Sequence, residues 1–253
     1  MRRLAQLGTG AALLCAALSA RADALGELKA ALVRGAVQAT VRAAVDTQTW
    51  RKLGEGEEAE EVRGQASVLV EDGARGLSVT HTKDVMARME REMQARARDA
   101  NSKTPTLSAL DEVSPRELVA MTSAAAALGR ALERGVFKGE RADLWQGKPA
   151  RALSFEMPIT TLSDRERKYA KKFSSLLEVW IGADGTPLAS RARLSASGRA
   201  FIVIGFELGN DEDSVYGLAD GRLVTLRRES RSRFSGPGER DERKVVTTLQ
   251  VQG

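Results

Sequence analysis

Apolar and polar residues alternate with a period of two along most of this chain. The first alternating run extends from Val37 to about Trp50, and two more follow at 62–71 and 76–82. Asp72-Gly73 separates the second run from the third as a turn. Alternation of this kind is typical of strands that bury one face. The three runs therefore predict an antiparallel meander, with the acidic stretch 54–61 as a solvated loop.

The stretch 175–208 contains three further strand-like runs, near 175–182, 187–197 and 199–208. Two turn signals join them, Ala183-Asp184-Gly185 and Ser197-Gly198, and Asp-Gly between apolar runs indicates a hairpin. Both faces of the run 199–208 are apolar, so we expect that strand to be covered on both sides or to line a cleft. Its apolar residues are Phe201, Ile202, Val203, Ile204 and Phe206.

More strands are expected at 148–157, 214–219, 222–234 and 244–251, with Asn210 to Asp213 read as a solvated turn and the polar stretch after Gly135 as a link. Helical spacing of apolar residues predicts helices at 23–34, 84–99 and 114–134, and a short one at 163–172. Ser114-Pro115-Arg116-Glu117 is a capping box with proline at the first helical position. Asp84 is the expected cap of the second helix.

Strands that follow strands, without regular alternation with helices, favour an antiparallel sheet with helices packed on one face. We therefore expect an α+β fold with a mostly antiparallel, curved β-sheet of about 8–10 strands, half-barrel-like, and two or three helices. No repeat and no linker divides the chain. The prediction is a single β-rich domain at 23–253 with a helical insertion at about 84–134.

Residues 1–22 have the pattern of a secretory signal peptide. Arg2 and Arg3 precede an uncharged apolar run, and Ala20-Arg21-Ala22 supplies a small-x-small site, so we expect cleavage after Ala22. No later segment approaches the length of a transmembrane helix. The mature chain would then lack cysteine and carry 36 basic against 34 acidic residues. The expected location is periplasmic or secreted, and this near-neutral balance argues against nucleic acid as a partner.

Candidate chemistry in the sequence is sparse. His81 is the only histidine and falls on the same face as Leu77 and Val79, so we interpret it as structural. Without other histidines or cysteines, a metal site would need carboxylates almost alone, and neither acidic cluster has calcium-loop spacing. No phosphate-binding glycine motif and no nucleophile elbow occurs. We therefore expect no cofactor, no metal and no catalytic residue.

Two binding surfaces remain as candidates. A basic patch for anionic partners would consist of Arg227, Arg228, Arg231 and Arg233, although an edge hairpin kept soluble by charge is the favoured interpretation. An apolar groove is the second candidate, although methionines at helical spacing are common in a core. Its expected residues are Met86, Met89, Met93, Ile202, Ile204 and Phe206.

The signal peptide, the long paired strands, the helical insertion and the strand that ends in Ala183-Asp184-Gly185-Thr186-Pro187 resemble the periplasmic lipoprotein-sorting proteins, also called outer-membrane lipoprotein carrier-like proteins. The resemblance covers most of residues 36–251 and implies an unclosed barrel around helices, with an apolar face that holds lipid chains. It carries over no functional residue.

The function predicted from the sequence is an exported, non-enzymatic protein that binds an apolar or lipidic ligand, a lipoprotein or an envelope partner on a curved sheet. One alternative is a cell-envelope structural or interaction protein without a small ligand. Another is a carboxylate-based hydrolase, which would need acidic side chains from separate elements to converge in one pocket. The oligomeric state is not indicated by the sequence.

Overall fold

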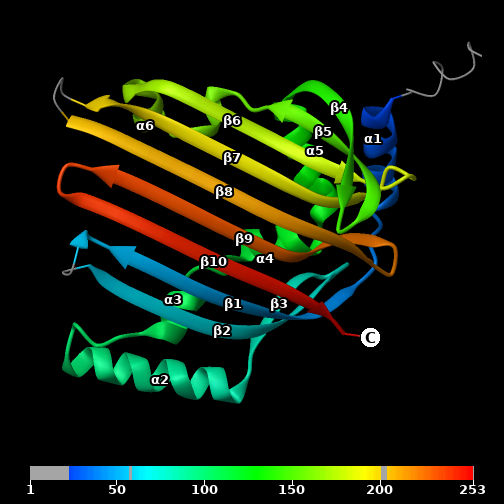
Figure 1. The fold of residues 1–253 in the computed structure, drawn as a ribbon. Coiled ribbons are helices and arrows are strands. Elements are labelled where there is room, and N and C mark those ends of the chain that lie inside the picture. Colours follow the sequence, from blue (N-terminus) through cyan, green and yellow to red (C-terminus); the bar gives the residue numbers. More distant parts are fainter. Residues whose placement is uncertain (1–22, 57–58, 201–203, 253) are drawn as a thin grey trace, which may run out of the picture.

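One antiparallel sheet organises the molecule in the computed structural model, which describes residues 23–56, 59–200 and 204–252 (Figure 1). Ten strands follow one another in the order β3-β2-β1-β10-β9-β8-β7-β6-β5-β4. Because β1 pairs with β10, the first and last strands of the chain meet in the middle of the sheet. The strands are β1 (Val41–Leu53), β2 (Glu60–Gly73), β3 (Gly76–His81), β4 (Val136–Trp145), β5 (Lys148–Glu156), β6 (Ala170–Ile181), β7 (Pro187–Ala200), β8 (Ile204–Ala219), β9 (Arg222–Gly236) and β10 (Glu239–Val251).

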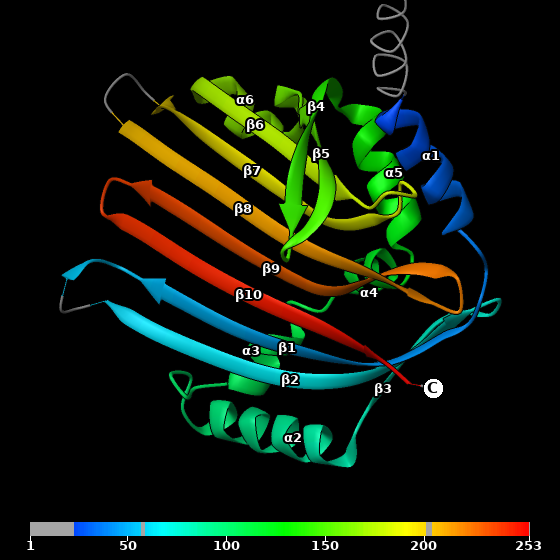
Figure 2. The same cartoon turned by 45° about the vertical axis from the view of Figure 1, so that its right-hand side comes forward.

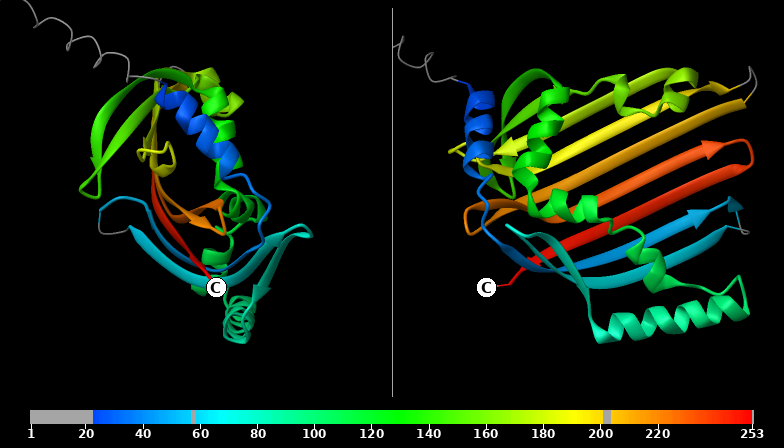
Figure 3. Two further views of the ribbon diagram at one scale, coloured as in Figure 1. Left: turned by 90° about the vertical axis from the view of Figure 1, so that its right-hand side faces the viewer. Right: turned by 180° about the vertical axis from the view of Figure 1, so that it is seen from behind.

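The sheet is curved and does not close, since β3 and β4 remain as its two edges (Figure 2). The helices lie on one side of it, here called the helix side, and the other side is called the open face (Figure 3). This confirms the predicted curved antiparallel sheet, but the described residues form six α-helices instead of two or three. They are α1 (Ala24–Arg34), α2 (Lys83–Arg98), α3 (Pro105–Leu110), α4 (Pro115–Thr122), α5 (Ala124–Arg134) and α6 (Asp164–Tyr169), with a 3-10 turn η2 (Ile159–Thr161).

Local capping explains several helix boundaries. The predicted capping box of Ser114 and Glu117 starts α4, but Thr82 caps α2, so the prediction of Asp84 was wrong. The expected helix at 114–134 is divided at Ser123 into α4 and α5. The expected loop after α2 contains α3, whose first amide groups donate to the Glu92 carboxylate at 2.9–3.0 Å. A capping group supplied by another helix cannot be read from local sequence.

Several predicted turns are strand interior. Ser197-Gly198 lies within β7, and residues 210–213 lie within the long β8. The expected core strand 199–208 is therefore the end of β7 and the start of β8, with residues 201–203 outside the described part. A glycine is needed at position 198 because a Cβ there would lie 1.9 Å from the Tyr169 carbonyl oxygen. The predicted polar link after Gly135 is β4.

Two apolar clusters join the helices to the sheet. In the first, α1 and α5 pack on β5 and β6 around Leu28, Leu128 and Phe155. In the second, α4 packs on β1, β2 and β10 around Val45, Leu118 and Leu249. All the strands and both clusters lie between Ala24 and Val251, so this part of the chain contains the whole apolar core of the described structure. A smaller cluster, with Trp145 against Trp180, lies where the β4–β5 hairpin bends toward the open face (Figure 3).

A buried ion pair connects the helices to two strand ends. Arg222 at the start of β9 and Asp72 near the end of β2 are both less than a tenth exposed, and their side chains meet at 2.5 Å. Arg222 also donates to the Ala39 carbonyl at 2.8 Å and to the Ser123 hydroxyl, and the Thr122 hydroxyl lies 2.6 Å from the same Asp72 carboxylate. The network therefore fixes the α4–α5 junction against the sheet.

Tyr216 on β8 gives the fold a testable dependence on pH. Burial, opposed by the hydrogen bond between its hydroxyl and that of Ser190, raises the Tyr216 pKa to about 12. The unfolded chain loses this proton at a lower pH, so the free energy of unfolding should decrease between about pH 10 and 12. One pKa unit corresponds to about 1.4 kcal/mol, so the full shift would correspond to about 2.8 kcal/mol. Because Tyr216 is only half-buried, we expect a smaller loss of about 2 kcal/mol.

Urea unfolding at several alkaline pH values would measure this loss. The Tyr216→Phe variant is the control, since lysine ionisation affects both proteins alike and only the tyrosine contribution differs. Parallel pH dependence in the two proteins would contradict the prediction.

Candidate functional site

The helices leave part of the helix side uncovered. They follow a diagonal from α1 and α5 through α4 to α3 and α2, and the ends of β8, β9 and β10 near the β9–β10 turn lie outside it (Figure 3). A cleft of about 300 Å³ lies between this strand surface and the residues that begin α4. Its lining residues are Glu112, Val113, Glu117, Leu118, Met121, Asn210, Glu212, Arg228, Ser230, Ser232, Arg243, Val245 and Thr247.

The cleft has an apolar wall and a charged one. Leu118 and Met121, which are fully buried, form the apolar wall together with Val113 and Val245. On the charged side, the Arg228 guanidinium lies 3.8 Å from both Glu117 and Glu212. These separations are too long for hydrogen bonds. Arg228 is therefore a cation that can still donate to a polar group entering the cleft.

Arg243 is the second cation of the cleft, and its neighbours act on its charge in opposite directions. It forms an ion pair with Glu112, and burial together with the nearby charge of Arg51 lowers the Arg243 pKa from its ordinary value. Arg51 in turn makes a bidentate contact with Asp241 at 2.7 and 3.0 Å. The three glutamates of the cleft are thus each next to an arginine, and Glu117 also caps α4. This arrangement can bind polar or charged groups, and it leaves no carboxylate free of a partner.

An apolar row lies directly beside the cleft. Asn210 and Ser232 line the cleft and are cross-strand partners, and two residues further along their strands Leu208 is paired with Phe234. Period-two alternation places these residues on the same side of the sheet. The row continues through Ala196 to Phe173 on the next two strands. Phe173 and Leu208 are half-buried and Phe234 is 36% exposed, with no helix over the β8–β9 part of the row (Figure 3).

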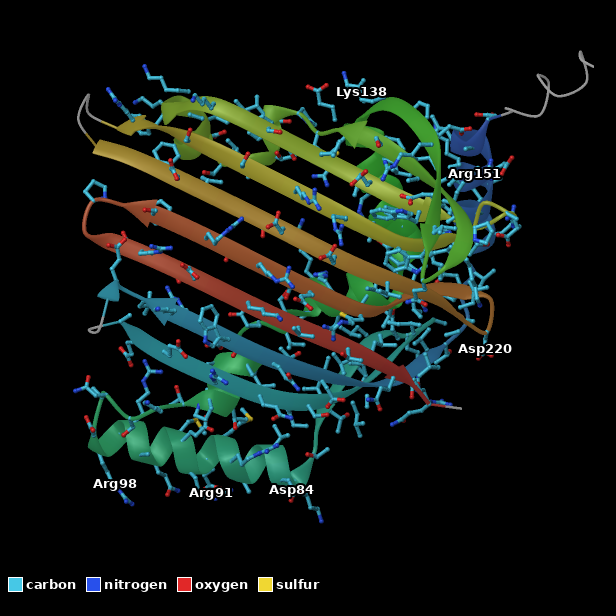
Figure 4. The ribbon with its side chains drawn as sticks, viewed as in Figure 1. Asp84, Arg91, Arg98, Lys138, Arg151 and Asp220 are labelled. Atoms are coloured by element: carbon cyan, nitrogen blue, oxygen red, sulfur yellow. The ribbon has the colours of Figure 1, made fainter. Side chains whose placement is uncertain are left out.

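The residues of the predicted apolar groove are not brought together. Met86 and Met93 are exposed on α2, and Met89 is half-buried beside Val85. Helix α2 lies along the β2–β3 edge, where Asp84, Arg91 and Arg98 point away from the sheet (Figure 4). Phe206 lies on β8, which is separated from β2 by β1, β10 and β9 in the sheet. Ile204 begins β8, and Ile202 lies outside the described residues, as does the expected cleavage site at Ala22.

The predicted basic patch is divided between the two sides of the sheet. Arg228 lies in the cleft on the helix side. Arg227 and Arg231 are on the open face, where Glu229 contacts both, and Arg233 lies 3.4 Å from Asp211. Two carboxylates, Glu229 and Asp211, therefore only partly offset the charges of these three arginines. Neighbouring residues of a strand point to opposite sides, so ordinary alternation separates Arg228 from the other three, and the bulge of β9 lies before Arg227.

The remaining candidates lead to no chemical site. His81 is half-buried at the end of β3, and its Nδ1 has no hydrogen-bond partner in the described structure. Among the residues described, no cluster of histidine, cysteine or acidic side chains could hold a metal ion. No helix in that same part is long and apolar enough to cross a bilayer.

The cleft itself was missed at the sequence level. Arg228 was predicted only as part of the basic patch, and Asn210 and Glu212 fall in the stretch that was interpreted as a turn. The helical residues of the cleft are marked only by the capping box. Searches of protein-family models, curated proteins and solved structures found no match to this chain. The site is therefore interpreted from its geometry alone.

Proposed function

We propose that this chain is an exported, non-enzymatic protein that binds an amphipathic, lipid-like ligand on the helix side of its sheet. The observation that supports this is the contact between a charged cleft and an uncovered apolar row. The head of such a ligand would accept hydrogen bonds from Arg228 and Ser232, and its chain would lie over Leu208 and Phe234. Sites for such ligands are usually apolar surfaces with a few polar groups that fix orientation.

Continuity between the two surfaces supports this interpretation over an interaction protein without a ligand. The cleft alone is small for a long acyl chain. The apolar row extends the binding surface across four strands, from β9 to β6. The cleft and the row lie on the same side of the curved sheet. The glutamates of the cleft would be the candidates for a carboxylate-based hydrolase, but their arginine and helix-cap partners are better suited to positioning than to proton transfer.

Mass spectrometry of the purified protein and displacement of a fluorescent fatty acid test the proposal. We expect acyl chains in the purified protein and a fatty-acid affinity that decreases at least roughly tenfold in the double variant Leu208→Ser, Phe234→Ser, since each apolar side chain contributes about 1.5–3 kcal/mol when covered. The matched control is Leu144→Ser, Leu218→Ser, two leucines that are 63% and 60% exposed on β4 and β8.

Three results would contradict the proposal: no acyl chain and no fatty-acid binding, equal losses in the two double variants, or turnover of an ester or glycoside substrate that Glu212→Gln abolishes. The last result would favour the hydrolase instead. Circular dichroism of each variant would confirm that the sheet is retained.

A further inference from the structure

Three cations without acidic partners gather at one end of the sheet, where β6 begins and β7 ends, near α6 (Figure 1). Lys171, Lys172 and Arg199 are exposed and border a shallow hollow of about 600 Å³. Neither ion pairs nor hydrogen bonds of their side chains occur in the described part of the chain, although Glu207 also borders the hollow. The open-face arginines of β9, by contrast, are all paired.

Backbone geometry brings these cations close together. Lys172 is opposite Ser197, and Arg199 is opposite Gly205, while a register shift between Ala170 and Lys172 inserts Lys171. Three glycines border the hollow: Gly198 lies against the Tyr169 carbonyl and Gly236 near the Phe234 ring, whereas the backbone at Gly205 is accessible. Nothing lies within 4 Å of the position that a Cβ would occupy at Gly205.

Aromatic groups lie at the same end. The Phe206 ring lies against Gly198 on the helix side, and Phe234 of the apolar row is close by on β9. Lys172 and Arg199 alternate with these positions along their strands and are therefore on the open face. Lys168 of α6 adds a further charge, 5.5 Å from the Tyr169 ring, while Arg167 is paired with Asp164. This end of the sheet therefore has unpaired cations on the open face and aromatic side chains on the helix side. An anionic bilayer that meets this end would offer phosphates to the cations and acyl chains to the aromatic rings.

We propose that this end of the sheet docks on an anionic membrane surface. Lys171, Lys172 and Arg199 contact lipid phosphates there, and the apolar row opens toward the bilayer. The inference goes beyond ligand binding, because docking requires no occupant in the cleft. An acidic protein partner would need its own complementary shape, whereas a bilayer needs only charge and a flat approach.

The test is vesicle co-sedimentation of the chain from Asp23, which contains the whole described core. We expect binding to phosphatidylcholine vesicles in which about one lipid in three is phosphatidylglycerol, and none to phosphatidylcholine alone. The triple variant Lys171→Gln, Lys172→Gln, Arg199→Gln should weaken binding roughly a hundredfold, since each basic residue near such a surface contributes about a factor of five.

The matched control removes the same residue types on other elements, at Lys29, Lys148 and Arg130, which are exposed on α1, β5 and α5. Its binding should stay close to that of the unmodified chain, and added salt should release the protein. Failure to bind anionic vesicles, or equal losses in the two triple variants, would overturn membrane docking. Membrane docking would also be overturned if the unmodified chain bound inorganic phosphate but did not bind the anionic vesicles. Acyl-chain occupancy is measured separately, so the two proposals can fail independently.

Discussion

Replacing Arg222 by alanine should lower the free energy of unfolding by about 3–5 kcal/mol, the usual effect of removing one member of a buried ion pair. Asp72 is 7% exposed and would be left in the interior with only Thr122 as a hydrogen-bonding side chain. The Ala39 carbonyl would lose its donor as well. Because this network fixes the α4–α5 junction, the loss should also loosen the wall of the cleft.

Urea unfolding monitored by tryptophan fluorescence would measure this effect. Arg227→Ala is the control, since that arginine is also paired but is largely exposed, and surface pairs contribute at most about 1 kcal/mol. A double variant with Asp72→Leu and Arg222→Met should regain most of the stability. An apolar pair of similar volume has no desolvation penalty when it is buried. Equal effects of Arg222→Ala and Arg227→Ala would show that the buried pair does not stabilise the junction.

The elements of the sheet could be predicted where one face is regularly buried. The strands β1 and β2 alternate clearly, with Val41, Ala43 and Val45 buried on one side. The turn to β3 is at 74–75, directly after the predicted Asp72 and Gly73, which are the last paired residues of β2. The capping box at Ser114 was equally informative, since it is a local interaction. Such features depend on residues that are close in the chain, so they can be recognised in the sequence.

The elements that were missed depend on contacts between distant residues. Ser197-Gly198 has the composition of a turn, yet the glycine is there because the Tyr169 carbonyl approaches β7. In β8, residues 210–213 are polar because two of them face the charged cleft and the other two pair with arginines, and not because the chain reverses there. The cleft and the apolar row were hidden for the same reason: both are formed by register across β6 to β10, which a single strand does not encode.

Gly185→Ala should destabilise the fold by more than the conformational preference of glycine alone explains. Gly185 has a φ of 80°, a left-handed conformation that costs a residue with a side chain about 1–2 kcal/mol. A Cβ at this position would also lie 2.6 Å from the Glu27 carbonyl oxygen in α1. Helix α1 is tied to the same turn by a 2.9 Å hydrogen bond from Arg34 to the Asp184 carbonyl. The helix would therefore have to move, and its core contacts through Leu28 would weaken.

Gly147→Ala separates the two contributions. Gly147 has a φ of 77° in the β4–β5 turn, and nothing lies within 4 Å of the position of its Cβ. Its substitution should cost only the conformational part, about 1–2 kcal/mol, whereas Gly185→Ala should cost about 3 kcal/mol or more, since overpacking adds about 1–3 kcal/mol. Equal unfolding free energies for the two variants would mean that α1 yields without cost. Hydrogen exchange along α1 would then show whether the new methyl group displaces the helix. A displaced helix should exchange its amide hydrogens faster in Gly185→Ala and not in Gly147→Ala.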